Sequence, residues 1–236
     1  MPHDMLHISG LQAWYGESHI LHGVDMHVAQ GEVVTLLGRN GAGRTTTLRA
    51  IMGLVGSRRG SIHIDGQETI GMSTHGIARL GLGYCPEERG IFSSLSTHEN
   101  LLLPPRLKGR AQGMSVEQIY KMFPNLAERA NSPGTRLSGG EQQMLAVARI
   151  LRTGARLLLL DEISEGLAPV IVQKLGAMIL ALKKDGFTIV LVEQNFRFAA
   201  PLADRFYVME HGQMVQEFTQ AQLPSKMDLL HEFLGV

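Results

Sequence analysis

Nine consecutive residues combine glycines, a cation and hydroxyls in an order that suits the binding of phosphate groups. They are Gly38, Arg39, Asn40, Gly41, Ala42, Gly43, Arg44, Thr45 and Thr46. The apolar run 33–37 precedes them, and Leu48 and Ile51 follow at helical spacing. Glycines between a strand and a helix let backbone N–H groups approach phosphate oxygens, and the helix adds the positive end of its dipole. The segment therefore predicts a phosphate loop in which Thr45 can ligate magnesium. A glycine-rich turn without a ligand is the alternative.

Two adjacent carboxylates, Asp161 and Glu162, follow the apolar run 157–160. A run that is apolar on both faces is typical of a buried parallel strand, and ligands bind beyond the carboxyl ends of such strands. Asp161 could hold magnesium through water, and Glu162 could orient or deprotonate a water molecule. The alternative is a pair of acids on the surface at the end of a strand.

A second anion-binding position is predicted at the start of another helix. Ser138 and Glu141 have the spacing of a capping box, and Gly139 and Gly140 leave the first N–H groups of that helix accessible. A helix that is capped and binds nothing is the alternative. Near the N-terminus, Tyr15 could stack on a flat ligand ring, although an ordinary loop aromatic would look the same.

The elements that must position these residues follow from the apolar pattern. Buried strands are expected at 33–37, 80–85, 157–160 and 188–192, with short strands at 5–8 and 20–28. Residues 206–209 and 213–215 flank His211-Gly212 and predict a hairpin. Between the strands, residues 95–137 change character: a capping box at Ser115 starts a helix that Pro124 should end. The pattern predicts an α/β core with a small helical insertion.

Composition narrows the function. The 236 residues are 44% hydrophobic, enough for a sizeable core, and suggest one domain with a subdomain. Lys plus Arg and Asp plus Glu are 22 each, which argues against a nucleic-acid partner. The single cysteine, Cys85, excludes an internal disulfide and is expected to be a buried hydrophobe. The ten histidines show no metal-ligand spacing. Neither a signal peptide nor a bilayer-spanning run is seen, so we expect a cytosolic chain whose membrane role comes through a partner.

The phosphate loop, the stretch 137–143 (Leu-Ser-Gly-Gly-Glu-Gln-Gln) and the stretch 157–162, in this order, resemble the ATP-binding subunit of ABC transporters. The resemblance covers nearly the whole chain, and 137–143 is its most specific part. Residues 36–43, 84–89, 164–169 and 191–195 are similar to the branched-chain amino acid uptake group, in particular the shorter of its two ATPase subunits. Urea and short-amide importers share much of this pattern.

The resemblance implies a fold: one ABC ATPase domain over residues 1–236. It has a phosphate-loop NTPase core with a mostly parallel sheet, an N-terminal antiparallel β subdomain, and a helical subdomain at about 95–150 that carries the 137–143 motif. It also implies partners, namely transmembrane permease subunits, a second ATP-binding subunit and, indirectly, an extracytoplasmic solute-binding protein. The chain would lie at the inner face of the cell membrane.

The resemblance further implies a role for each candidate residue, with ATP and Mg²⁺ as cofactors. Tyr15 would stack on adenine, and residues 38–46 would hold the phosphates. Thr45, Glu87 and Asp161 would serve the magnesium ion. Glu162 would act on the attacking water, with Gln194 beside it near the γ-phosphate. Ser138, Gly139 and Gly140 would complete the site of the opposing subunit, so that two subunits close on two ATP molecules.

Glu87 and Gln194 differ from the general family pattern but agree with the branched-chain group. Arg44 is the serious departure, because it stands where the family has lysine. An ammonium is a compact charge that fits between phosphates, whereas a guanidinium is planar and broader. Losing one good transition-state contact costs about 3 kcal/mol, or roughly a hundredfold in rate. We therefore expect Arg44 to slow hydrolysis more than it weakens ATP binding.

Three functions follow. The first is the ATP-hydrolysing motor of an importer, which an intact Glu162 favours. The second is a nucleotide-binding partner that hydrolyses weakly, which Arg44 favours. The third is a soluble family member acting in DNA repair or translation, which the single ATPase half, the lack of a long insertion and the balanced charge disfavour.

Overall fold

A six-stranded sheet lies at the centre of the computed structural model, which describes residues 3–107 and 112–234. The strand order is β10-β9-β3-β8-β7-β6, and only β10 runs antiparallel to its neighbour. The strands are β3 (Val33–Leu37), β6 (Leu82–Cys85), β7 (Leu157–Asp161), β8 (Thr188–Val192), β9 (Arg205–Glu210) and β10 (Gln213–Thr219). The mostly parallel sheet and the C-terminal hairpin expected from the sequence are confirmed.

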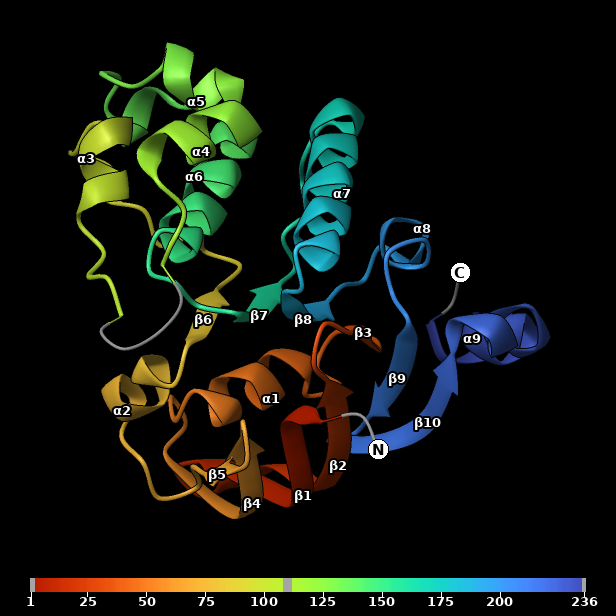
Figure 1. The fold of residues 1–236 in the computed structure, drawn as a ribbon. Coiled ribbons are helices and arrows are strands. Elements are labelled where there is room, and N and C mark those ends of the chain that lie inside the picture. Colours follow the sequence, from red (N-terminus) through yellow and green to blue (C-terminus); the bar gives the residue numbers. More distant parts are fainter. Residues whose placement is uncertain (1–2, 108–111, 235–236) are drawn as a thin grey trace.

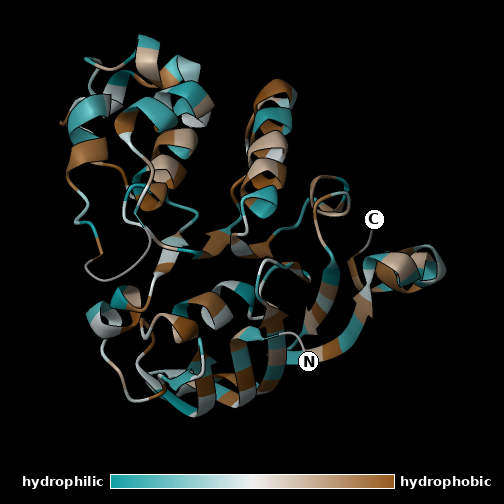
Figure 2. Ribbon diagram, in the orientation of Figure 1, coloured by the Kyte–Doolittle hydropathy of each residue, from teal (hydrophilic) through white to brown (hydrophobic). Residues whose placement is uncertain are grey.

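Strand β7 explains why its sequence shows no alternation. Leu157 and Leu159 pack toward the antiparallel sheet, while Leu158 and Leu160 pack toward the helices on the opposite face. All five residues of β7 are buried, and the strand is drawn in brown for hydrophobic residues (Figure 2). Because both faces are covered, the carboxylates at its end are carried by a rigid, dry strand.

A second, four-stranded sheet is built from the N-terminal part of the chain in the order β2-β1-β4-β5. Its strands are β1 (Asp4–Tyr15), β2 (Ser18–Ala29), β4 (Ser57–Ile64) and β5 (Gln67–Glu68), all antiparallel to their neighbours. The strands expected at 5–8 and 20–28 were too short. Register shifts between Ile8 and Leu11 interrupt the alternation of β1, so the sequence pattern stops before the strand does.

Helix α1 (Arg44–Ile51) lies between the two sheets (Figure 1). Its buried Leu48 and Ile51 join one hydrophobic core with Ile8 of the antiparallel sheet and Leu36 of the central sheet. The helix that follows the phosphate loop is therefore held from both sides.

The segment between β6 and β7 forms a group of helices on the opposite side of the central sheet from α1 (Figure 1). They are α3 (Thr97–Leu102), α4 (Val116–Met122), α5 (Pro124–Glu128), the 3₁₀ turn η1 (Gly134–Arg136) and α6 (Gly139–Leu151), and α2 (Thr74–Arg79) precedes β6. Ser115 and Ser138 both form the expected capping boxes. Pro124 does more than end α4: it occupies the first turn of α5, where its missing N–H costs nothing.

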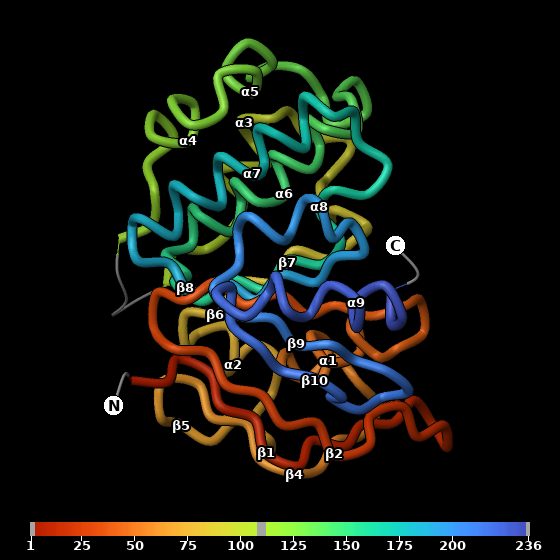
Figure 3. The backbone as a smooth tube through the Cα atoms, turned by 90° about the vertical axis from the view of Figure 1, so that its right-hand side faces the viewer, coloured from red at the N-terminus to blue at the C-terminus, as the bar shows by residue number. Residues whose placement is uncertain are grey.

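Helix α7 (Pro169–Lys184) runs beside α6, as Figures 1 and 3 both show. The short helix α8 (Phe196–Ala199) follows β8. The last described elements are η2 (Gln220–Lys226) and the amphipathic α9 (Met227–Leu234), which packs on β9 and β10. Among the described residues, no helix is both long and apolar enough to cross a bilayer.

Candidate functional site

The phosphate loop links the buried β3 to α1 and turns on glycines. Gly41 and Gly43 have φ values of 80° and 108°, in the left-handed region that favours glycine. Together with Ile20, Glu87, Glu162, Glu165 and Gln194, residues 40–46 line a pocket of about 430 Å³. The structure therefore brings together the predicted loop and the predicted acids from distant parts of the chain.

Two residues of the predicted loop lie beneath or beside the pocket. Gly38 sits against the end of β9, where a Cβ would come 2.4 Å from the Met209 carbonyl oxygen. Arg39 turns away to the C-terminal helix, where its Nε and Nη2 donate to the carbonyls of Phe233 and Glu232 at 3.1 and 3.2 Å. A cation at a helix C-terminus complements the helix dipole. The Arg39 side chain thus supports α9 in this structure.

Arg44 is the buried cation of the pocket, with 4% of its side chain exposed. Its Nη2 donates to Glu162 Oε1 at 2.9 Å and to Asn40 Oδ1 at 3.3 Å. Burial lowers the pKa of Arg44, while Glu162 and Asp161 raise it. Its Nη1 is buried and has no hydrogen-bond partner among the described residues. A buried guanidinium nitrogen without a partner is costly, and a phosphate oxygen in the loop would satisfy it.

Asp161 and Thr45 meet where a magnesium ion was expected. The Thr45 hydroxyl donates to Asp161 Oδ1 at 3.1 Å, and the Tyr84 hydroxyl donates to Asp161 Oδ2 at 3.0 Å. Burial raises the pKa of Asp161, the two hydroxyls lower it, and the charges of Glu162 and Glu87 raise it further. The described residues contain no cluster of three or more His, Cys, Asp or Glu side chains that could hold a metal ion by themselves. A hydroxyl and a carboxylate still fit Mg²⁺, which prefers oxygen ligands and keeps several waters.

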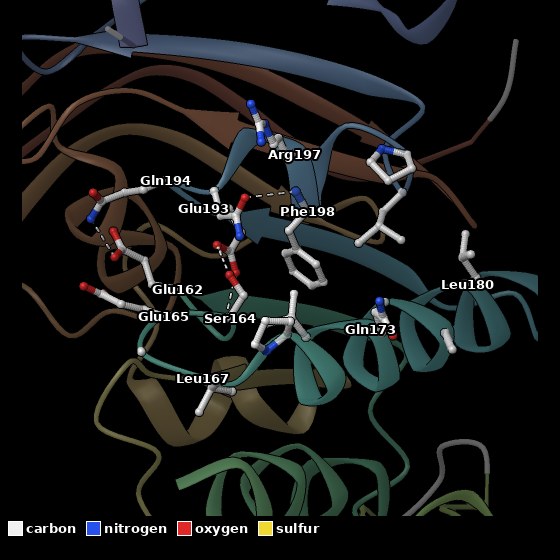
Figure 4. Close-up of a pocket in the computed structure, with 18 residues that line it drawn as sticks. Glu162, Ser164, Glu165, Leu167, Gln173, Leu180, Glu193, Gln194, Arg197 and Phe198 are labelled. Carbon is white, nitrogen blue, oxygen red and sulfur yellow. Dashed lines mark hydrogen bonds between the residues drawn. The ribbon is translucent and has the colours of Figure 1, made fainter. Parts of the chain in front are cut away.

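Glu162 lies between Arg44 and Gln194. Gln194 Nε2 donates to Glu162 Oε2 at 2.9 Å, so both carboxylate oxygens have partners. Gln194 and Glu162 follow the ends of two neighbouring strands, β8 and β7, and their side chains point toward each other (Figure 4). Glu165 also lines the pocket, and its interaction with Glu162 raises the pKa of Glu165. The arrangement suits a carboxylate that orients and deprotonates water next to a phosphate.

The remaining predicted residues lie outside this pocket. Ser138 caps α6, where its hydroxyl accepts from the Glu141 N–H at 3.3 Å. Gly139 lies next to the Arg89 guanidinium, and Gly140 lies so close to Ile171 that a Cβ would come 2.7 Å from its Cγ2. Tyr15 ends β1 with 38% of its surface exposed. None of these four residues is among those that line the phosphate-loop pocket.

Sequence reasoning missed four residues of the site, which are Tyr84, Ser164, Glu165 and Glu193. Glu193 is 1% exposed and accepts from the Ser164 N–H and hydroxyl at 3.0 and 2.7 Å. Burial raises the pKa of Glu193 to about 7, against hydrogen bonds that lower it. The acidic run 161–165 was visible in the sequence, but its pairing with 193–194 depends on which strands are neighbours.

Glu193 and Ser164 also line a larger cavity of about 1100 Å³ between α7 and α8 (Figure 4). Its wall is mostly apolar and includes Leu180 and Phe198. Glu162, Glu165 and Gln194 are common to both cavities, so the two adjoin at these residues.

The model of the family described as ABC transporter matches residues 21–165, which hold the phosphate loop and both acids. The chain belongs to the ABC transporter family. This confirms the family expected from the sequence, and with it an ATP-binding ATPase subunit.

Cys85 is buried and free, as expected, and burial raises its pKa to about 12.

Three relatives match this chain over nearly their whole length. The high-affinity branched-chain amino acid transport ATP-binding protein BraG of Pseudomonas aeruginosa is 39% identical over 98% of this chain and 100% of its own. The probable branched-chain amino acid transport ATP-binding protein LivF of Archaeoglobus fulgidus is 32% identical over 93% and 94%. The lipopolysaccharide export system ATP-binding protein LptB of Escherichia coli K12 is 30% identical over 94% and 93%.

Solved structures agree on the fold. An ATP-binding subunit of an ABC transporter has a TM-score of 0.81 at 26% identity and covers 98% of this chain and 100% of its own. A dimeric ATP-binding cassette in a post-hydrolysis state, bound to ADP and Pi, has a TM-score of 0.80 at 25% identity over 92% and 99%. The fold expected from the sequence, with its antiparallel and mostly parallel sheets, is confirmed.

Proposed function

We propose that this chain is the ATP-binding and hydrolysing motor subunit of an importer for branched-chain or related amino acids. The observation that carries the proposal is the buried Arg44, which lines the phosphate-loop pocket beside Glu162 and whose Nη1 has no hydrogen-bond partner among the described residues. A pocket with a buried, unpaired cationic donor and a facing carboxylate suits an anion whose bond is cleaved by water. The names of BraG and LivF support the branched-chain substrate class.

Each residue contributes a separate step. The N–H groups of residues 40–46 and the Arg44 Nη1 bind the phosphates. Thr45 and Asp161 are the ligands that fit Mg²⁺, which neutralises phosphate charge when bound. Glu87, which lines the same pocket, is a further candidate ligand. Glu162 orients the attacking water and accepts its proton, while Gln194 holds the Glu162 carboxylate through Oε2. Tyr15 is proposed to stack on the adenine.

Ser138, Gly139 and Gly140 point to a second ATP-binding subunit as a partner. They start α6 away from the pocket of their own chain, and the dimeric cassette bound to ADP and Pi supports a paired arrangement. We propose that these residues contact the phosphate bound by the partner. Transmembrane permease subunits and an extracytoplasmic solute-binding protein complete the proposed assembly at the inner face of the membrane. The balanced charge of 22 basic and 22 acidic residues argues against a nucleic-acid partner.

The test is steady-state ATP hydrolysis by the purified chain beside Glu162→Gln. The proposal expects hydrolysis by the native chain and its near-complete loss in Glu162→Gln, with ATP binding retained. If the native chain binds ATP without turnover and Arg44→Lys restores it, the chain is a weakly hydrolysing partner instead.

A second candidate is the motor of an exporter, which the similarity to LptB favours. An importer for urea or short amides is a further alternative within the proposed class. Co-purification of the tagged chain with its membrane subunits, followed by amino acid uptake in vesicles, separates these transport roles. Uptake of leucine that requires an intact Glu162 supports the importer, and its absence with stable membrane partners points to another cargo.

A further inference from the structure

The segments that follow β7 and β8 are joined by one backbone bond and by bonds from two side chains. The two strands run parallel as neighbours, with Asp161 opposite Val192. The Glu162 N–H donates to the Val192 carbonyl at 2.9 Å, which continues the pairing one residue past β7. Beyond this point the chain turns, and Glu162 adopts a φ of 49°.

That backbone conformation is strained for a residue other than glycine. It persists only where surrounding contacts hold it. Ile163, the next residue, is 1% exposed and anchors the turn in the core. The Glu162 side chain is thereby turned toward Arg44 in the phosphate-loop pocket. Whatever fixes residues 162–164 also fixes the direction of the Glu162 carboxylate.

Glu193 supplies the bonds at the far end of this turn. Its Oε1 accepts from the Ser164 N–H at 3.0 Å, and its Oε2 accepts from the Ser164 hydroxyl at 2.7 Å. The next residue, Gln194, holds the Glu162 carboxylate itself at 2.9 Å. Figure 4 shows these hydrogen bonds side by side: Gln194 bonds to Glu162, and Glu193 bonds to Ser164. Three consecutive residues, 192–194, therefore hold the turn 162–164 at its backbone and at both ends.

Stability alone is a poor explanation for Glu193. The residue is 1% exposed, and burial of its carboxylate is unfavourable, as the rise of its pKa to about 7 indicates. Its two hydrogen bonds to Ser164 compensate for the cost of burying the carboxylate, and they leave little net gain in stability. A side chain that is expensive to bury and makes two directional bonds is suited to fixing geometry.

We propose that Glu193 is a positioning residue for ATP hydrolysis, which holds the turn 162–164 through Ser164 and so directs the Glu162 carboxylate at the phosphate loop. The inference rests on the proposed ATPase function. Glu193 acts through Ser164 and touches neither phosphate nor water in the reaction. Its loss should therefore lower kcat and leave the binding of ATP nearly unchanged.

Four single variants test this on the full chain: Glu193→Ala, Glu193→Gln, Ser164→Ala and Thr188→Val. Alanine at 193 removes both bonds. Glutamine keeps them, because its oxygen can accept from the Ser164 N–H and its amide can donate to the hydroxyl oxygen. Thr188→Val is the matched control, because Thr188 is a buried residue at the other end of β8 whose hydroxyl oxygen accepts from the Gly31 N–H at 2.9 Å. The Thr188→Val variant therefore also loses one hydrogen bond of a buried residue, but far from the turn 162–164.

The expected results are a fall in kcat of at least tenfold for Glu193→Ala, about threefold for Ser164→Ala, and less than threefold for Glu193→Gln. The dissociation constant for a fluorescent ATP analogue, measured without magnesium, should change less than threefold in each variant. The double variant Ser164→Ala/Glu193→Ala should be no slower than Glu193→Ala, because both changes break the same contact. Thr188→Val should lower the melting temperature and keep kcat.

A readout without hydrolysis makes the test independent of the proposed function. Amide hydrogen exchange of a peptide covering residues 160–168 should speed up in Glu193→Ala and stay as in the native chain in Glu193→Gln and Thr188→Val. Unchanged exchange in Glu193→Ala would overturn the positioning role even if the native chain proved inactive. A kcat that falls equally in Glu193→Ala and Thr188→Val would also overturn it, since the loss would then follow stability. Native inactivity with the expected exchange pattern would contradict only the proposed function.

Discussion

Arg44 Nη2 and Glu162 Oε1 lie 2.9 Å apart as a buried ion pair, with 4% and 9% of the two side chains exposed. The pair joins the residue that departs from the family pattern to the proposed catalytic carboxylate. The cation of the phosphate loop therefore holds the acid that is proposed to act on water. We expect a bound phosphate to compete with Glu162 for the Arg44 guanidinium.

Replacement of Arg44 by lysine should raise the rate of hydrolysis. Lysine places all its donors on one nitrogen, so it is less able to hold Asn40 and Glu162 together than a guanidinium is. We expect kcat to increase between about tenfold and a hundredfold in Arg44→Lys, with KM for ATP changed by less than about fivefold. Steady-state kinetics at saturating magnesium measures both.

The matched control for that change is Arg156→Lys. Arg156 lies next to the opposite end of β7 and stacks over the Phe187 ring. The substitution Arg156→Lys should leave kcat unchanged. Turnover of Arg44→Lys that equals that of the native chain would remove the hypothesis that Arg44 restrains hydrolysis.

Breaking the ion pair should destabilise the nucleotide-free chain. Glu162→Gln leaves a buried guanidinium with less compensating charge, and removal of one partner from a buried pair costs about 3–5 kcal/mol. ADP supplies the missing negative charge, so the rise in melting temperature on adding ADP should be larger in Glu162→Gln than in the native chain. Thermal unfolding with and without ADP and EDTA measures both shifts. Equal ADP-induced shifts in the two proteins would show that the pair contributes little.

The stability of the chain should depend on the charge of Glu193. Its pKa in the folded protein is raised to about 7, mainly by burial. The unfolded value is about 4.3. The folded state therefore keeps a proton that the unfolded state releases, and stability falls as pH rises from about 4.3 to about 7. Above that window the whole loss of stability is reached, on the order of 4 kcal/mol.

Glu193→Gln lacks this ionisation, so its melting temperature relative to the native chain should be higher at pH 8 than at pH 5.5. Melting curves at both pH values, with Thr188→Val as the control, test this expectation. A difference between variant and native chain that stays constant with pH would show that Glu193 does not titrate in this range.

Gly212 should tolerate no side chain. It has a φ of 75°, and a Cβ there would come 1.9 Å from the Ile20 carbonyl oxygen. Its N–H donates to the Ala42 carbonyl in the phosphate loop at 2.8 Å, so movement of Gly212 disturbs the pocket. Gly66 also has a φ of 75° but has no atom within 4 Å of the same position among the described residues.

Comparing Gly212→Ala with Gly66→Ala thus separates the steric clash of a Cβ with Ile20 from the strain of the left-handed backbone. Both should lose about 1–2 kcal/mol through the left-handed conformation, and Gly212→Ala should lose at least about 2 kcal/mol more. Urea unfolding measures the difference, and ATP binding should weaken only in Gly212→Ala. Similar losses in the two variants would mean that the hairpin shifts to accommodate the side chain.

Local chemistry in the sequence was enough to predict the phosphate loop, the strand that carries Asp161 and Glu162, and the capped start of α6. Each depends on neighbours in the chain: glycines at turns, apolar runs that both faces of a sheet must bury, and a serine three residues before an acid. The length of β1 escaped prediction because an irregular register between Ile8 and Leu11 hides its alternation. Pro124 ends α4 as predicted, but the start of α5 at the same residue escaped prediction, because a proline can start one helix as well as end another.

Only the tertiary structure could decide which side chains meet. The contacts of Arg44 with Glu162, Tyr84 with Asp161, and Glu193 with Ser164 join residues that are 118, 77 and 29 positions apart. They exist because β6, β7 and β8 are neighbours in the sheet and β3 directs its loop to the same edge. Apolar patterns show that a strand is buried but carry no information on its neighbours, since any buried strand is equally apolar on both sides. The residue types of the site could therefore be predicted from the sequence. Its ion pair and the hydrogen bonds that hold the turn 162–164 follow from the strand order.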